Sequence, residues 1–227
     1  MNLIFRTGIA SLFIQFATGI FDTYVLTLPV DPKYTILRHL LAMELLVQCI
    51  EASFYIWLVF NFANVTNITH YRYYDWVITT PTMLFTYCMY LLYLRPVIIE
   101  EASSDEAMNI WSMVLENTPT LVPIFILNNL MLLAGYMAEI GNLTHMTGAI
   151  LGFVPFFAMF YLIYDNYAKF TTVGQMTFWY FSGVWGLYGI ASLLRYRYKN
   201  AMYNILDLFS KNFFGIFLAM VLYSVRS

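Results

Sequence analysis

The stretch NILDLFSKNFFGIFLAMVLY, residues 204–223, is apolar enough to cross a membrane yet carries Asp207 and Lys211 in its first half. An ionisable residue in mid-membrane costs at least about 2.5 kcal/mol, so such residues are usually functional. The two residues are four positions apart and share a helix face. They could form a structural ion pair. Alternatively, the amine could form a Schiff base with a carbonyl compound while the carboxylate supplies the counter-charge.

The composition of the whole chain is that of an integral membrane protein. Its 227 residues are 61% hydrophobic and only 11% charged, whereas soluble domains average about 25% charged residues. A formal net charge of −2 leaves no basic face for nucleic acid. Aromatic residues make up 19% of the chain, which predicts an interior that grips something flat and apolar. We expect neither an enzyme nor a metal site.

Seven segments are long and apolar enough to span a bilayer, which predicts an all-α membrane protein, a seven-transmembrane-helix bundle forming one domain over residues 1–227. The expected spans are 7–28, 37–62, 73–94, 119–139, 146–165, 173–194 and 202–224. The acidic connection between the third and fourth spans predicts a short surface helix near residues 104–116. With the N-terminus extracellular, the count of Lys and Arg is five inside against four outside, so the positive-inside rule barely favours this orientation. Three N-x-T sequons then fall outside, at Asn64, Asn67 and Asn142.

The third span reads YRYYDWVITTPTMLFTY, residues 71–87, and has a polar helical face. Asp75 is a second candidate counter-ion, and Arg72, one turn away, is expected to hold it ionised. Pro81 is expected to kink the helix. The polar face comprises Arg72, Asp75, Thr79, Thr82 and Thr86.

These motifs resemble those of the microbial (type 1) rhodopsins, and the resemblance extends over the whole chain. The specific pieces are R-x-x-D-W-x-x-T-T-P on the third span and D-x-x-x-K on the seventh. The resemblance implies all-trans retinal bound to Lys211 as a protonated Schiff base, with Asp75 and Asp207 as counter-ions and Arg72 as their partner. In the sixth span, WGLYG has Gly189 where the family usually has proline. The implied retinal pocket comprises Trp76, Thr79, Thr80, Met83, Met131, Gly135, Gly152, Phe156, Trp185 and Tyr188.

Four of the seven spans carry a continuous polar face, more than helix-to-helix hydrogen bonds require. Polar groups inside a membrane bundle face its interior or a water-filled cavity. The faces therefore predict an aqueous path between spans one, two, three and seven, in which Glu44 and Glu51 favour cations. Either glutamate could instead be a hydrogen-bonded carboxyl that only ties helices together. Besides the third span, the faces are Thr7, Ser11, Gln15, Thr18 and Asp22; Glu44, Gln48, Glu51 and Tyr55; and Asn200, Asn204, Asp207, Lys211 and Asn212.

The string DLFSKN and two glutamates seven residues apart are similar to the channelrhodopsin pattern. That similarity implies a central gate of Ser11, Glu51 and Asn212, with Glu44 along the ion path. It also implies a Thr80–Asn128 contact that controls closing. The chain lacks the further glutamates of the algal channels' second helix, and its compactness resembles the rhodopsins encoded by large DNA viruses.

We therefore expect a retinal-binding, light-gated channel that conducts monovalent cations or protons across a lipid bilayer, as a monomer or a homo-oligomer. The first alternative is an outward proton pump. It is disfavoured because Thr86 stands where such pumps carry a proton-donating carboxylate. The second alternative is a sensory rhodopsin that signals through the acidic loop 96–117.

Overall fold

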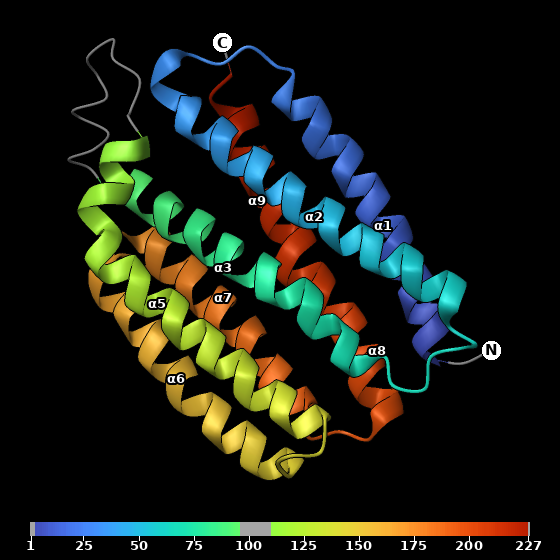
Figure 1. Cartoon of the computed structure of the whole chain (residues 1–227). Helices are drawn as coiled ribbons and strands as arrows, with labels where there is room; N and C mark the ends of the chain where they lie inside the picture. The colour runs from blue at the N-terminus through green and yellow to red at the C-terminus, as the bar shows by residue number, and fades with distance from the viewer. Residues whose placement is uncertain (1–2, 96–109, 227) are drawn as a thin grey trace.

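The computed structural model describes residues 3–95 and 110–226, and nearly all of them are helical. Seven long rods make up the described bundle (Figure 1). Six are the helices α1 Leu3–Leu26, α2 Thr35–Asn61, α3 Thr69–Tyr93, α5 Ile110–Glu139, α6 His145–Asn166 and α7 Thr172–Ala191. The seventh joins α8 Tyr196–Asp207, the π-helical turn η3 Leu208–Asn212 and α9 Phe213–Ser224. Short 3₁₀ turns, η1 Pro32–Tyr34 and η2 Ala168–Phe170, lie in two of the connections.

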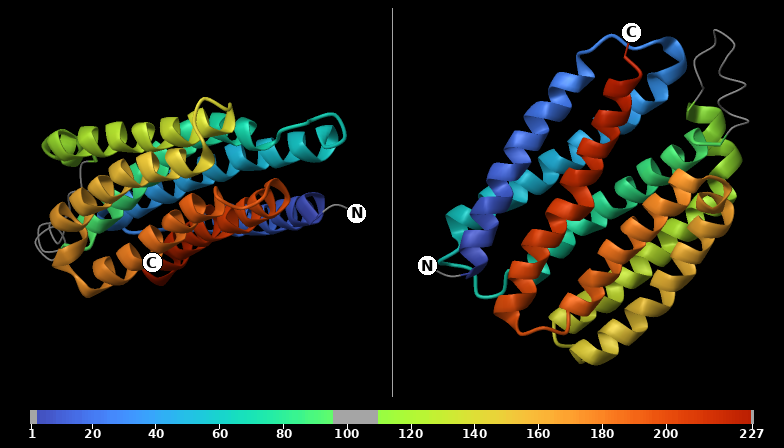
Figure 2. Two further views of the ribbon diagram at one scale, coloured as in Figure 1. Left: turned by 90° about the horizontal axis from the view of Figure 1, so that it is seen from below. Right: turned by 180° about the vertical axis from the view of Figure 1, so that it is seen from behind.

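The rods pack as a closed ring in chain order, and the last rod returns to α1. In Figure 1, α3 lies between a group of α1, α2 and α9 and a group of α5, α6 and α7; Figure 2 shows the same grouping from below and from behind. The chain begins at one end of the bundle and finishes at the other. We call these ends the N-terminal side and the C-terminal side.

The surface of the bundle is largely apolar, and its interior holds buried polar and charged side chains beside an apolar core. Phe60 is 82% exposed and Phe13 is 73% exposed, whereas Glu51 and Arg72 are 0% exposed. Such a surface suits lipid, where helices satisfy their own backbone groups. Within the described residues, five helical segments reach membrane-spanning length and hydropathy: Leu3–Leu26, Pro32–Asn61, Ile110–Glu139, His145–Phe170 and Tyr196–Ser224. The remaining two rods, α3 and α7, complete the seven-transmembrane-helix bundle, and α3 carries the buried polar face.

The fourth span begins earlier than the sequence indicated. α5 starts at Ile110 and runs unbroken through Pro119 and Pro123, so residues 110–116 belong to it and not to a separate surface helix. Prolines are tolerated inside membrane helices, because neighbouring helices and side chains can satisfy the freed backbone groups. The rest of the expected surface helix, residues 104–109, lies outside the described residues.

Two local features position the interior. In η3 the Phe213 backbone N–H donates to the Leu208 carbonyl, five residues back, so the turn around Lys211 is wider than an α-helical turn. Between α5 and α6, a Cβ added at Gly148 would lie 2.6 Å from the Ala138 Cβ and 3.0 Å from the Ala134 carbonyl oxygen. Small residues therefore let these two backbones approach closely.

Candidate functional site

Lys211 is buried at the centre of the bundle and is paired with a carboxylate of another helix. Its Nζ donates to Asp75 Oδ2 at 2.8 Å, and the two side chains are 2% and 4% exposed. Among the described residues Asp75 is the only ion-pair partner of Lys211, so the structural ion pair with Asp207 that the sequence left open is not formed. Thr79 lies one turn along α3, with its hydroxyl donating to the Asp75 carbonyl oxygen at 3.0 Å.

Asp207 is held by a different set of groups. Arg72 Nη1 lies 3.2 Å from Asp207 Oδ2, Tyr55 Oη donates to the same oxygen at 2.7 Å, and Tyr188 Oη donates to Oδ1 at 2.7 Å. The expectation that Arg72 holds Asp75 was therefore wrong. Helical side chains lean toward the N-terminus of their helix, which carries the guanidinium of Arg72 away from Asp75 and toward α8.

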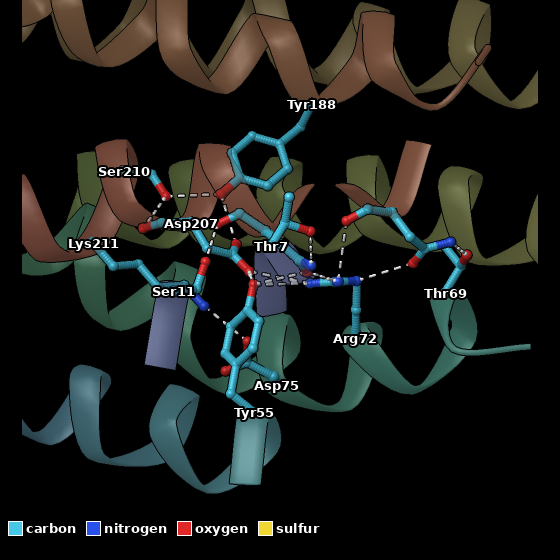
Figure 3. Close-up of polar contacts among 12 residues, drawn as sticks. Thr7, Ser11, Tyr55, Thr69, Arg72, Asp75, Tyr188, Asp207, Ser210 and Lys211 are labelled. Carbon is cyan, nitrogen blue, oxygen red and sulfur yellow. Dashed lines mark hydrogen bonds and ion pairs between the residues drawn. The ribbon is translucent and has the colours of Figure 1, made fainter. Parts of the chain in front are cut away.

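Arg72 organises a larger group of hydrogen bonds on the N-terminal side, which we call the Arg72 network (Figure 3). Its Nε donates to Asn200 Oδ1 at 3.2 Å, and its Nη2 donates to Asn204 Oδ1. The side-chain amide of Asn204 in turn donates to Thr7 Oγ1 at 2.7 Å. Its backbone carbonyl accepts from Ser11 Oγ at 2.7 Å. The network comprises Thr7, Ser11, Tyr55, Thr69, Arg72, Tyr188, Asn200, Asn204, Asp207 and Ser210.

A second group of contacts lies on the C-terminal side, and we call it the Asp22 network. Gln48 Nε2 donates to Asp22 Oδ2 at 2.6 Å, and Thr18 Oγ1 donates to Gln48 Oε1 at 3.4 Å. Asn212 Nδ2 donates to Thr18 Oγ1 at 2.9 Å. Beside it, the hydroxyl of Thr86 donates to Glu44 Oε1. In the structure, the polar faces predicted on the first, second and seventh spans are buried, except that Thr7 is half-buried.

Between the two networks lie polar side chains without protein hydrogen bonds. Both carboxylate oxygens of Glu51 and both amide atoms of Gln15 are buried and have no partner among the described residues. The expected gate of Ser11, Glu51 and Asn212 is not joined by hydrogen bonds within the described chain: Ser11 belongs to the Arg72 network and Asn212 to the Asp22 network.

Two further expectations concern α3. The Thr80–Asn128 contact is present, since Asn128 Nδ2 donates to Thr80 Oγ1 at 2.9 Å. Thr82, by contrast, does not share the buried polar face; it is half-exposed and its hydroxyl donates back to the Ile78 carbonyl at 2.9 Å. The buried arc of α3 extends instead toward Trp76, which leaves Thr82 at its edge.

A cavity of about 110 Å³ lies against Lys211. Of the predicted pocket residues, Trp76, Thr80, Met83, Met131, Gly135, Gly152, Phe156, Trp185 and Tyr188 line it, and Thr79 does not. Thr79 is fully buried, and its hydroxyl bonds to the backbone of Asp75. Lining residues that the sequence did not single out for the pocket are Tyr73, Leu132, Ala138, Glu139, His145, Gly148, Ala149, Phe153, Gly189, Ser192, Tyr203 and Ser210.

The lining of the cavity, mainly apolar and aromatic, suits a flat apolar molecule attached to Lys211. Trp76 and Trp185 present rings to it from α3 and α7, and Trp185 Nε1 is a buried donor without an acceptor in the described chain. Gly189, where the family usually has proline, leaves room for a lining ring, because a Cβ there would be 2.5 Å from Phe153 Cζ.

One buried ion pair closes the cavity at the end of α5. Lys199 Nζ lies 2.5 Å from Glu139 Oε1, both side chains are 4% exposed, and His145 Nδ1 is 3.9 Å from the same oxygen. No sequence pattern indicates this pair, because the two residues are far apart along the chain and neither belongs to a motif.

Comparison with known proteins identifies the family of this chain. Residues 3–225 match the family model described as bacteriorhodopsin-like protein. The crystal structure of viral rhodopsin OLPVRII has 25% sequence identity and a TM-score of 0.81, with all of both chains covered. Blue light-absorbing proteorhodopsin from Med12 has 17% identity and a TM-score of 0.74, with 98% of each chain covered.

Xanthorhodopsin, described as a light-driven ion pump with dual chromophore, has 18% identity and a TM-score of 0.72, covering 98% of this chain and 92% of that one. No curated protein is similar enough to match the chain. The family model covers nearly the whole chain, and the chain therefore belongs to the bacteriorhodopsin-like family of microbial rhodopsins, a family that implies a retinal chromophore.

Proposed function

We propose that this protein is a light-gated cation channel in which all-trans retinal is bound to Lys211. The proposal rests on how the buried polar side chains are arranged between α1, α2, α3 and α8–α9. There the Arg72 network and the Asp22 network lie on opposite sides of a layer formed by Gln15 and Glu51, whose polar atoms have no protein partner in the described chain. Buried polar groups normally have hydrogen-bond partners. Such a layer is what a closed gate between two hydrated regions would look like.

Several residues would hold the chromophore. Lys211 supplies the amine, Trp76 and Trp185 the two rings that flank a polyene, and Gly152 the space at the far wall. Bound there, retinal supplies the absorption of light and a change of shape. Asp75 supplies the negative charge nearest to the Lys211 nitrogen.

The proton on the Lys211 nitrogen has one acceptor in place. Asp75 Oδ2 is 2.8 Å away, within reach for direct transfer. Asp207 already takes hydrogen bonds from Arg72, Tyr55 and Tyr188, so it is less free to take this proton. Transfer to Asp75 removes an attraction of about 6 kcal/mol at an effective dielectric constant near 20.

Loss of that charge pair changes which arrangement of the neighbouring helices is favoured. The Glu51 carboxylate makes no hydrogen bond with the described residues, so a shift of α2 there breaks none of its side-chain hydrogen bonds. We infer that the open state provides partners and water to Glu51 and Gln15, and that cations then cross between α1, α2, α3 and α9. A change at Lys211 can drive this only through different contacts in the two states.

An outward proton pump is the second candidate, and one contact favours it. Thr86 occupies the position of the usual donor carboxylate, but its hydroxyl bonds to Glu44, so a carboxyl group of α2 lies next to that position. Glu44 could then return a proton toward Lys211.

Whole-cell photocurrent against holding voltage tests the proposal, in cells supplied with retinal. A channel gives a current that reverses sign, with a reversal voltage that follows the cation gradient. Glu51→Ala and Asn212→Ala should then alter the conductance while leaving the pigment intact. An outward current of constant sign would indicate the pump. Intact pigment without current would contradict both and favour a sensor.

A further inference from the structure

Two carboxylates from different helices are buried together on the C-terminal side. Asp22 of α1 and Glu44 of α2 are both 0% exposed. Each accepts one side-chain hydrogen bond, Asp22 from Gln48 at 2.6 Å and Glu44 from Thr86. Each also keeps one oxygen, Asp22 Oδ1 and Glu44 Oε2, without a partner among the described residues. Neither forms an ion pair with any basic side chain that the structure describes.

The opposite wall of this site is a glycine. A Cβ added at Gly215 of α9 would lie 2.8 Å from Asp22 Oδ2 and still closer to Gln48 Nε2, nearer than real Cβ atoms come. The backbone of α9 therefore presses directly on the Asp22–Gln48 pair. This is a constriction between α1, α2 and α9, where a larger side chain would have to displace Gln48 and Asp22.

Further unpartnered oxygens point to a ligand at this level. Asn212, three residues before Gly215 on the same helix, is 0% exposed and its Oδ1 has no partner in the described chain. Its amide nitrogen is linked through Thr18 to Gln48. The site thus offers several buried oxygen atoms and, among the described residues, no basic side chain paired with them.

Buried charges in proteins are paired or bound to metal ions. We propose that Asp22 and Glu44 bind a monovalent cation at the constriction formed with Gln48 and Gly215, which makes it a selectivity site in series with the Glu51 layer. The placement in the conduction path rests on the proposed channel function, whereas binding of the cation does not.

Binding is tested first on purified protein by thermal unfolding. A ligand that binds only the folded state raises the melting temperature. The wild type should melt higher in sodium chloride than in N-methyl-D-glucamine chloride of equal ionic strength, and Asp22→Asn should abolish that difference. Equal melting temperatures of the wild type in both salts would overturn the site, whatever the photocurrent shows.

The role in conduction is tested by substitutions. Asp22→Asn should lower the permeability to Na⁺ relative to H⁺ about tenfold. That factor corresponds to the lower end of the free energy that one hydrogen bond to a charged group contributes. Gly215→Ala should abolish most of the photocurrent with the pigment retained. Gly19→Ala is the matched control, because its Cβ would make only ordinary contact, 3.7 Å from Gln48 Oε1. Wild-type current in Gly215→Ala, with an unchanged permeability ratio in Asp22→Asn, would refute the constriction. A wild type with no reversing current would instead refute the proposed channel.

Discussion

Arg72 is the residue whose removal the structure makes easiest to quantify. Arg72→Gln leaves Asp207 buried, 1% exposed, without its cation. At the 3.2 Å separation of Nη1 and Oδ2, the attraction is about 5 kcal/mol for an effective dielectric constant near 20. Desolvation offsets much of that, and breaking one side of a buried ion pair costs about 3–5 kcal/mol. For a chain of this size, each 1 kcal/mol lost from the free energy of unfolding lowers the melting temperature by roughly 2–4 °C. The melting temperature of Arg72→Gln should therefore fall by roughly 6–20 °C.

The measurement is thermal unfolding in detergent, followed by circular dichroism, so it does not depend on the chromophore. Arg197→Gln is the matched control, because Arg197 lies in α8, the helix that carries Asp207, and is exposed. The double variant Arg72→Gln/Asp207→Asn should melt above Arg72→Gln, since it no longer buries an unpaired charge. A fall of less than about 2 °C in Arg72→Gln, or no recovery in the double variant, would refute the assignment of Arg72 as the partner of Asp207.

Three further outcomes are expected. Lys211→Ala should form no coloured pigment with retinal, and a visible absorption band in that variant would contradict the attachment site. Asn128→Ala removes the 2.9 Å hydrogen bond to Thr80, which is worth about 1 kcal/mol; the decay of photocurrent after a flash should change about fivefold, and an unchanged decay would show that this contact does not control closing. Gly189→Ala should lower the free energy of unfolding by about 1–3 kcal/mol, because the added methyl group overpacks against Phe153. Gly183→Ala, with nothing within 4 Å of its Cβ, should melt close to the wild type. Equal melting temperatures of the two variants would contradict the packing described at Gly189.

The seven rods could be predicted because each is a long, mainly apolar segment, and in four of them polar residues also recur at helical spacing. What spacing along one helix cannot give is the rotation and axial offset of a helix against its neighbours. Ser11 and Thr18 lie on the same face of α1, seven residues apart. The pattern alone could not decide that Thr18, and not Ser11, lies opposite Asn212.

Other errors came from long side chains and from proline. Arg72 lies on the buried polar face of α3, as predicted. Its long side chain, however, carries the guanidinium to Asp207 and not to Asp75. Pro119 was read as the beginning of a helix, and it lies within one. The Thr80–Asn128 contact was expected from family resemblance alone, since no rule of spacing links residues on two different helices.

The close approach of α5 and α6 determines which parts of the molecule can move independently. Gly148 faces Ala134 and Ala138 so closely that an added Cβ would lie 2.6 Å from the Ala138 Cβ. Because sliding one helix past the other would force such close-packed backbones apart, we expect this hairpin to act as a rigid frame for the far wall of the cavity. In the proposed channel, a displacement that starts at Lys211 would then be transmitted away from the frame, toward α1, α2 and α9. Those helices meet through exchangeable side-chain hydrogen bonds, so they can move in small steps without disrupting the bundle.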